Sequence, residues 1–92
     1  MVVLSSPPEA FNKQTDSDKL RFWDHFVEVV VSELGKQCDG YQLMNEPNNP
    51  VYGFFSREHT ASALVHGMQI IRAFAKPTAI VAINICMDIW FL

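Results

Sequence analysis

The sequence contains little of what marks several classes of protein. Its two cysteines, Cys38 and Cys86, lie far apart among 92 residues, so they indicate neither a disulfide framework nor a metal site. Seven lysines and arginines are scattered among ten acidic residues, for a net charge of −3. A nucleic-acid partner needs a basic surface that neutralises phosphates, and this balance excludes one. The chain also has no run of like charges, no low-complexity segment and no internal repeat.

Long apolar runs are scarce as well. Residues 1–4 are apolar, but no basic segment precedes them and Ser5-Ser6-Pro7-Pro8 interrupts them, so no signal peptide is predicted. The apolar stretch over residues 78–92 is too short to span a bilayer and contains Asn84 and Asp88. We therefore expect no membrane association and interpret this stretch as a buried strand. The location of the protein stays open.

What the sequence does contain is typical of a globular protein. Hydrophobic residues make up 49% of the chain and charged residues 18%, which is not the composition of a disordered segment. A length of 92 residues is enough for one small domain and not for two. A single domain over residues 1–92 is therefore predicted.

The first half of the chain predicts a strand and a helix. Residues 2–4 form a short apolar strand, and a polar loop follows over residues 5–14. Thr15 begins a helix, with Asp18 three residues later in a capping relationship, and Gly35 ends it. The predicted core stripe of this helix is Leu20, Trp23, Phe26 or Val27, Val30 and Leu34.

The second half repeats the alternation. Residues 41–44 form a strand after the Asp39-Gly40 turn, and a long loop over residues 46–55 contains two prolines and a glycine. Ser56 caps a second helix, which Pro77 ends. Its predicted core stripe is Ala61, Leu64, Val65, Met68, Ile71 and Ala75. Residues 79–83 are a continuous apolar run, typical of a parallel strand covered on both faces.

The order β-α-β-α-β predicts an α/β fold with three parallel strands and two helices on one face of the sheet. In such folds ligands bind beyond the carboxyl ends of the strands. The long loop over residues 46–55 lies on that side.

One motif suggests chemistry. Asn45-Glu46-Pro47 directly follows the apolar strand Tyr41-Gln42-Leu43-Met44. It resembles the fourth strand of clan A glycoside hydrolases, which include cellulase-type family 5 and xylosidase-type family 39 enzymes. The resemblance covers nearly the whole chain as part of a TIM (β/α)8 barrel, although only the triplet is diagnostic. It implies an O-glycosyl hydrolase that acts on carbohydrates, with Glu46 as the general acid/base and Asn45 bound to the sugar 2-hydroxyl.

The chemistry fits these residue types. Cleaving a glycosidic bond requires a carboxylic acid to protonate a poor leaving group, and a neighbouring amide can hold the sugar. Aromatic rings can stack on sugar faces, so Tyr52 and Phe54 are substrate-binding candidates, although rings tucked over the barrel rim are the alternative that the sequence favours. Asn84, Asp88 and Trp90 follow the last predicted strand, and their loop is expected to border the same cleft, so each is a further candidate for sugar contact.

No metal or cofactor is expected. The three histidines, His25, His59 and His66, lie on the two predicted helices without the spacing of metal ligands, and we interpret them as solvated or packed helix residues.

The resemblance is incomplete. A retaining glycosidase needs two carboxylates about 5 Å apart, and the second comes from the seventh strand of the barrel. No other glutamate of this chain follows a predicted strand. The chain is therefore a fragment of a larger enzyme, a complete small protein that keeps part of a barrel, or an unrelated α/β binding module in which Asn-Glu-Pro is incidental. We expect the isolated chain to be inactive and to self-associate through open strand edges.

Overall fold

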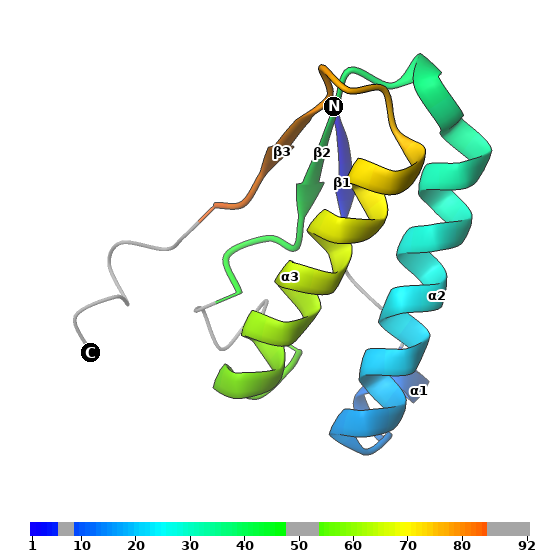
Figure 1. Ribbon diagram of the computed structural model, residues 1–92. Helices are drawn as coiled ribbons and strands as arrows, with labels where there is room; N and C mark the ends of the chain where they lie inside the picture. The colour runs from blue at the N-terminus through cyan, green and yellow to red at the C-terminus, as the bar shows by residue number, and fades with distance from the viewer. Residues whose placement is uncertain (6–8, 48–53, 85–92) are drawn as a thin grey trace.

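The computed structural model describes residues 1–5, 9–47 and 54–84. These residues form one parallel sheet of three strands, β1 (Val2–Leu4), β2 (Gly40–Leu43) and β3 (Ile80–Ala82), in the order β1-β2-β3 (Figure 1). The helices are α1 (Glu9–Asn12), α2 (Asp16–Leu34), the short 3-10 helix η1 (Gly35–Gln37) and α3 (Arg57–Phe74). The predicted α/β class and parallel pairing are confirmed.

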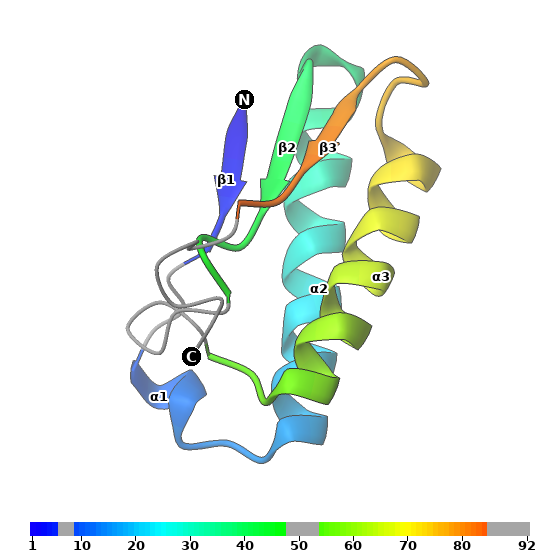
Figure 2. The same cartoon turned by 90° about the vertical axis from the view of Figure 1, so that its left-hand side faces the viewer.

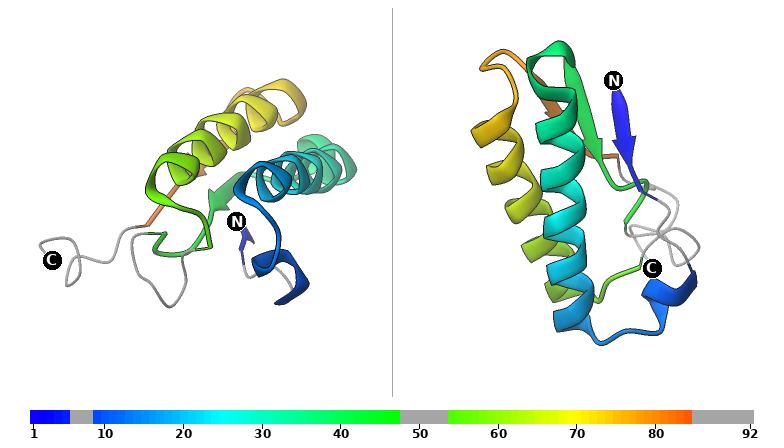
Figure 3. Two further views of the ribbon diagram at one scale, coloured as in Figure 1. Left: turned by 90° about the horizontal axis from the view of Figure 1, so that it is seen from below. Right: turned by 90° about the vertical axis from the view of Figure 1, so that its right-hand side faces the viewer.

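Among the described residues, helices cover only one face of the sheet. Helices α2 and α3 lie side by side on that face, and the described part of the chain places no helix of comparable length against the opposite face (Figures 2 and 3). The register pairs Val3 with Gln42 and Gln42 with Ala82, so these three residues share the open face. The prediction of two helices on one face is therefore confirmed. The described residues thus show the α/β fold with three parallel strands, and the finer prediction, that these belong to a TIM barrel, stays a prediction.

Helix α2 begins and ends where the sequence predicts. The Thr15 hydroxyl accepts a hydrogen bond from the Asp18 backbone N–H at 3.2 Å, and Gly35 ends the helix with a φ of 55°. Glycine adopts that left-handed conformation without the steric cost that a Cβ brings. Within α2 the fully buried residues are Trp23, Val27 and Val31, so the core line includes Val31, which the predicted stripe left out.

Helix α3 begins at the predicted cap, since the Ser56 hydroxyl accepts from the His59 backbone N–H. Its predicted core stripe is partly wrong. Ile71 and Ala75 are buried, but Val65 is 49% and Met68 46% exposed, and Ala61 is exposed as well.

The line of α3 that faces the sheet consists mainly of small residues. Ala63, Gly67 and Ile71 are its buried positions, each four residues after the last. A Cβ added to Gly67 would lie 2.9 Å from one methyl carbon of Leu43 on β2, so only glycine admits the Leu43 side chain at this distance. The sequence stripe counted large apolar residues, whereas the close approach of helix and strand selects small ones.

Two other predictions differ from the structure. The polar loop predicted over residues 5–14 contains helix α1, whose Phe11 is buried and contacts the rings of Phe22, Phe54 and Phe55. The last strand, predicted as covered on both faces, is an edge strand, and Ile80 is 60% exposed. Its apolar run therefore reflects one buried and one open face.

Candidate functional site

The candidate site lies where β2 and β3 end. Asn45 and Glu46 follow β2 directly, and Asn84 follows β3 by two residues. Because the two strands are parallel neighbours, their carboxyl ends meet at the same edge of the sheet. That is the edge at which α/β folds bind ligands.

Five residues are joined there by hydrogen bonds that involve the side chains of Gln42, Asn45 and Asn84. The Asn84 Oδ1 atom accepts from the Glu46 backbone N–H at 2.8 Å and from Gln42 Nε2 at 3.1 Å. The Asn84 Nδ2 atom donates to Asn45 Oδ1 at 2.9 Å. Gln42 Nε2 also donates to the Met44 carbonyl oxygen at 2.9 Å. The end of β3 therefore fixes the turn that carries Asn45 and Glu46.

The backbone of this turn adopts unusual conformations. Met44 has a φ of 65° and Glu46 a φ of 42°, and these are the only non-glycine residues with positive φ in the part of the chain described. Each costs of order 1–3 kcal/mol, and such residues persist where the surrounding structure holds them. Both flank Asn45, so the strain is concentrated on the motif that suggests chemistry.

The positive φ of Met44 also changes which way its side chain points. Strict alternation predicts that Gln42 and Met44 line the same open face of the sheet. Gln42 does lie on the open face, but Met44 is 2% exposed and belongs to the hydrophobic core beside Leu43. The prediction for Met44 was therefore wrong, because β2 ends at Leu43 and the chain turns at the next residue.

Among the described residues, Glu46 supplies the negative charge at this turn. Among the described residues no other acidic side chain follows a strand at this edge, and Glu46 itself is half-buried. Asp39 lies at the opposite edge, just before β2, where its hydrogen bond to Lys76 holds the pKa of its carboxyl below the usual range. Asp39 therefore lies at the amino ends of the strands and is not part of the candidate site.

The predicted aromatic residues have different outcomes. Phe54 is half-buried and packs against Phe11, Trp23 and Phe55, with ring centroids 5.1–5.6 Å apart. Its carbonyl oxygen accepts from Lys19 Nζ at 3.0 Å. These contacts hold Phe54 against α1 and α2, and stacking of Phe54 on a sugar stays a prediction. Tyr52, Asp88 and Trp90 lie outside the described residues.

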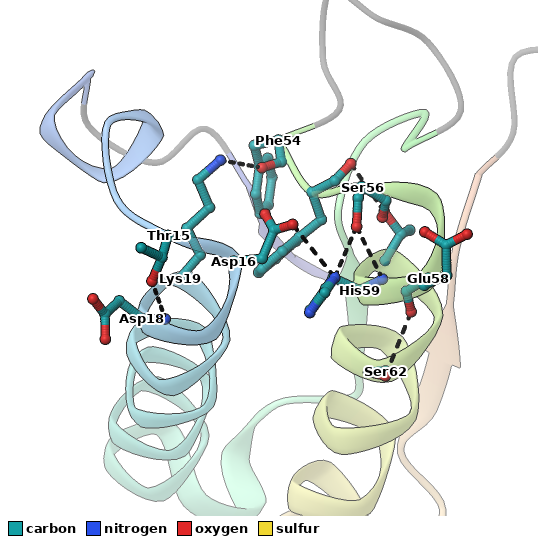
Figure 4. A network of polar contacts seen from close by, with 11 residues as sticks. Thr15, Asp16, Asp18, Lys19, Phe54, Ser56, Glu58, His59 and Ser62 are labelled. Carbon is teal, nitrogen blue, oxygen red and sulfur yellow. Dashed lines mark hydrogen bonds and ion pairs between the residues drawn. The ribbon is translucent and has the colours of Figure 1, made fainter.

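A second polar cluster joins the starts of α2 and α3 (Figure 4). The His59 Nδ1 atom lies 2.8 Å from the Ser56 hydroxyl oxygen and 3.5 Å from an Asp16 carboxylate oxygen. Further along the same helices, His66 Nδ1 lies 2.9 Å from an Asp24 carboxylate oxygen. These contacts link two packed helices, as the interpretation of the histidines as helix residues predicts. Over the described ranges no group of three or more possible metal ligands comes together.

Sequence reasoning found Glu46 and Asn45 from the motif but gave no role to Gln42. The available signal was a single polar residue inside the apolar strand Tyr41-Gln42-Leu43-Met44. Asn84 was predicted only as a possible sugar contact, and its bond to the Glu46 backbone was missed because the two residues are 38 positions apart in sequence.

Comparisons with known proteins add no relative. The chain matches no family model, no curated protein and no solved structure. None of the helices in the described part of the chain has the length and apolar character needed to cross a membrane.

Proposed function

We propose that this chain carries the acid/base region of a retaining glycoside hydrolase, with Glu46 as the proton donor and Asn45 as a sugar-binding amide. One observation carries the proposal. Asn45 and Glu46 lie at the carboxyl end of the central strand of a parallel sheet, in a strained turn that the neighbouring strand holds through Asn84. Strained, over-determined turns of this kind cluster at catalytic and ligand-binding sites.

The roles follow from the chemistry of retaining hydrolysis. In the first step the Glu46 carboxylic acid gives its proton to the glycosidic oxygen as the bond to the anomeric carbon breaks. A carboxylate on the other side of the sugar bonds to that carbon. In the second step the Glu46 carboxylate takes a proton from the water that displaces the enzyme carboxylate. Among the described residues no other carboxylate follows a strand at this edge, so in this proposal the partner carboxylate lies outside the described residues.

Asn45 supports the same reaction. An amide beside the acid can hold the sugar hydroxyl next to the anomeric carbon, and hydrogen bonds to the 2-hydroxyl strengthen as the transition state forms. The Asn45 side chain is only partly exposed, and Asn84 restrains it. An amide restrained before the sugar arrives loses little conformational freedom on binding.

The test uses a chimaera in which residues 1–92 replace the equivalent segment of an active clan A glycosidase. Glu46→Gln is expected to lower kcat/KM by about 10²–10⁴-fold on alkyl glycosides, because a poor leaving group depends on protonation. On 2,4-dinitrophenyl glycosides the first step needs little protonation, and the loss is expected to be much smaller.

Glu58→Gln is the matched control, because Glu58 is an exposed glutamate in the first turn of α3. It is expected to leave both activities unchanged. Equal losses on the two substrate types for Glu46→Gln would contradict the acid/base role. A chimaera that folds like its host but shows no activity would contradict it as well.

The alternative function is a non-catalytic α/β binding module. The observation that favours it is the open face of the sheet, where Val3 is 53% and Ile80 60% exposed. Exposed apolar surface of this kind marks an interaction site. The chimaera separates the two functions, since a binding module in that position does not restore catalysis.

A further inference from the structure

The hydrogen bonds around Asn84 have a fixed direction, because each end of the network is a backbone group. A backbone N–H can only donate, so the Asn84 atom that lies 2.8 Å from the Glu46 nitrogen must be the acceptor Oδ1. A backbone carbonyl can only accept, so the Gln42 atom that lies 2.9 Å from the Met44 carbonyl oxygen must be the donor Nε2. The same Nε2 points at Asn84 Oδ1, at 3.1 Å. Both ends therefore give Asn84 the same orientation.

The orientation of Asn84 determines the orientation of the Asn45 amide. With Oδ1 turned toward Glu46 and Gln42, Asn84 presents its NH₂ group to Asn45, whose Oδ1 accepts at 2.9 Å. This bond fixes which branch of the Asn45 amide carries the oxygen, so the Asn45 NH₂ group lies on the branch turned away from the Asn84 NH₂ group. An asparagine can otherwise present either atom to a ligand, because the two orientations differ by a half-turn of the amide.

We infer that Asn84 is a positioning residue, which fixes the Asn45 amide so that its NH₂ group is the group that meets the ligand and donates to it. The ligand atom beside Asn45 is then a hydrogen-bond acceptor, such as the oxygen of a sugar hydroxyl. The identity of the ligand rests on the proposed function, whereas the direction of the hydrogen bonds rests only on the backbone groups of Met44 and Glu46.

Two variants of Asn84 distinguish the bond that its oxygen accepts from the bond that its NH₂ group donates. Asn84→Asp keeps an oxygen that accepts from the Glu46 N–H but cannot donate to Asn45. The aspartate oxygen then faces the Asn45 oxygen, and the Asn45 amide is expected to rotate. Asn84→Ala removes both bonds. Ile83→Thr is the control, because Ile83 is an exposed β-branched neighbour in the same segment.

The first measurement is made by NMR on the ¹⁵N-labelled chain without ligand. Hydrogen exchange of the Glu46 amide is expected to accelerate about five-fold or more in Asn84→Ala, the loss of one hydrogen bond of about 1 kcal/mol, and to stay slow in Asn84→Asp. The Asn45 side-chain NH₂ signals are expected to shift in both variants and to stay in place in Ile83→Thr. Unchanged Asn45 signals in both Asn84 variants would overturn the inference, and so would fast exchange of the Glu46 amide in Asn84→Asp.

The second measurement adds methyl β-D-glucopyranoside and its 2-deoxy analogue as probes. The wild-type chain is expected to bind the 2-hydroxy sugar more tightly, and Asn84→Asp is expected to abolish that preference. Asn45→Asp should abolish it too while leaving the Glu46 amide protected, because the new carboxylate still accepts from Asn84. If the first measurement succeeds and neither sugar binds, the positioning by Asn84 stands and the carbohydrate function fails. A wild-type preference that survives in Asn84→Asp would overturn the positioning role.

Discussion

Replacing Gly67 with alanine tests how closely α3 approaches β2 behind the candidate site. The added Cβ would lie 2.9 and 3.0 Å from the two methyl carbons of Leu43, distances that packed side chains do not tolerate. Leu43 is 1% exposed, so its methyl groups cannot turn out into solvent and can move only by displacing or repacking their buried surroundings. Over-packing of a core costs about 1–3 kcal/mol. Alanine gains about 1 kcal/mol over glycine in a helix interior, so a net loss of about 1 kcal/mol is expected.

The sign reverses when Leu43 is shortened. Leu43→Ala alone is expected to cost about 2–5 kcal/mol, because it removes a buried leucine. In that background the Gly67→Ala methyl group meets no obstacle, and the change is expected to stabilise the protein by about 1 kcal/mol. The coupling between the two positions is then about 2 kcal/mol.

The assay is urea unfolding of the four proteins of this cycle, monitored by circular dichroism at two protein concentrations. Glu58→Gln serves as an exposed control on the same helix. A Gly67→Ala variant more stable than the wild type would refute the close approach of α3 to β2. So would the same effect of Gly67→Ala in both backgrounds, because additive effects mean that the two residues do not touch.

Two further predictions concern the open face and the core. The isolated chain is expected to show no turnover of aryl glycosides and, by light scattering, a mass above its 10.5 kDa, because exposed strand edges and apolar side chains favour association. Ile80→Lys on the sheet is expected to lower the measured mass, whereas Val65→Lys on α3 is expected to leave it unchanged. A wild-type chain that is a monodisperse monomer and turns over substrate would contradict both parts. Tyr41→Phe is expected to raise the free energy of unfolding by about 1 kcal/mol, because the buried Tyr41 hydroxyl has no hydrogen-bond partner among the described residues. Burial, with a smaller effect of Cys38, raises the Tyr41 pKa above its usual 10.0. The stability that this shift contributes is therefore fully present below pH 10.0 and is lost above it, as Tyr41 ionises first in the unfolded chain. Tyr41→Phe should remove this alkaline decline of the free energy of unfolding in urea titrations, and an unchanged decline would contradict the assignment.

The order of the main elements could be predicted from the sequence because the signals are local. Thr15 and Ser56 cap the helices that they precede, and Gly35 ends α2. Each of these effects involves residues within one helical turn, which a sequence displays directly. Alternation of strand and helix then predicts the parallel sheet.

The errors arose where distant segments meet. Helix α1 is stabilised by Phe11, whose ring partners Phe54 and Phe55 are more than forty positions away. Gly67 faces the core because Leu43 needs space there, and no helical periodicity of large residues reveals that. The same applies to the site, where the motif identifies Glu46 but the backbone reversal at Met44 and the bond from Asn84 depend on tertiary packing.

The bond between Asn84 and Glu46 also has a consequence for the order in which the molecule opens and closes. Strand β3 is three residues long and lies at the edge of the sheet, so it contributes few of the contacts that hold α2 against α3. Fluctuations that detach β3 therefore release the Asn45–Glu46 turn while both long helices stay packed. During synthesis the turn leaves the ribosome 38 residues before the side chain that fixes it. We therefore expect the geometry at Glu46 to form only once β3 has paired with β2, and to be lost whenever β3 detaches.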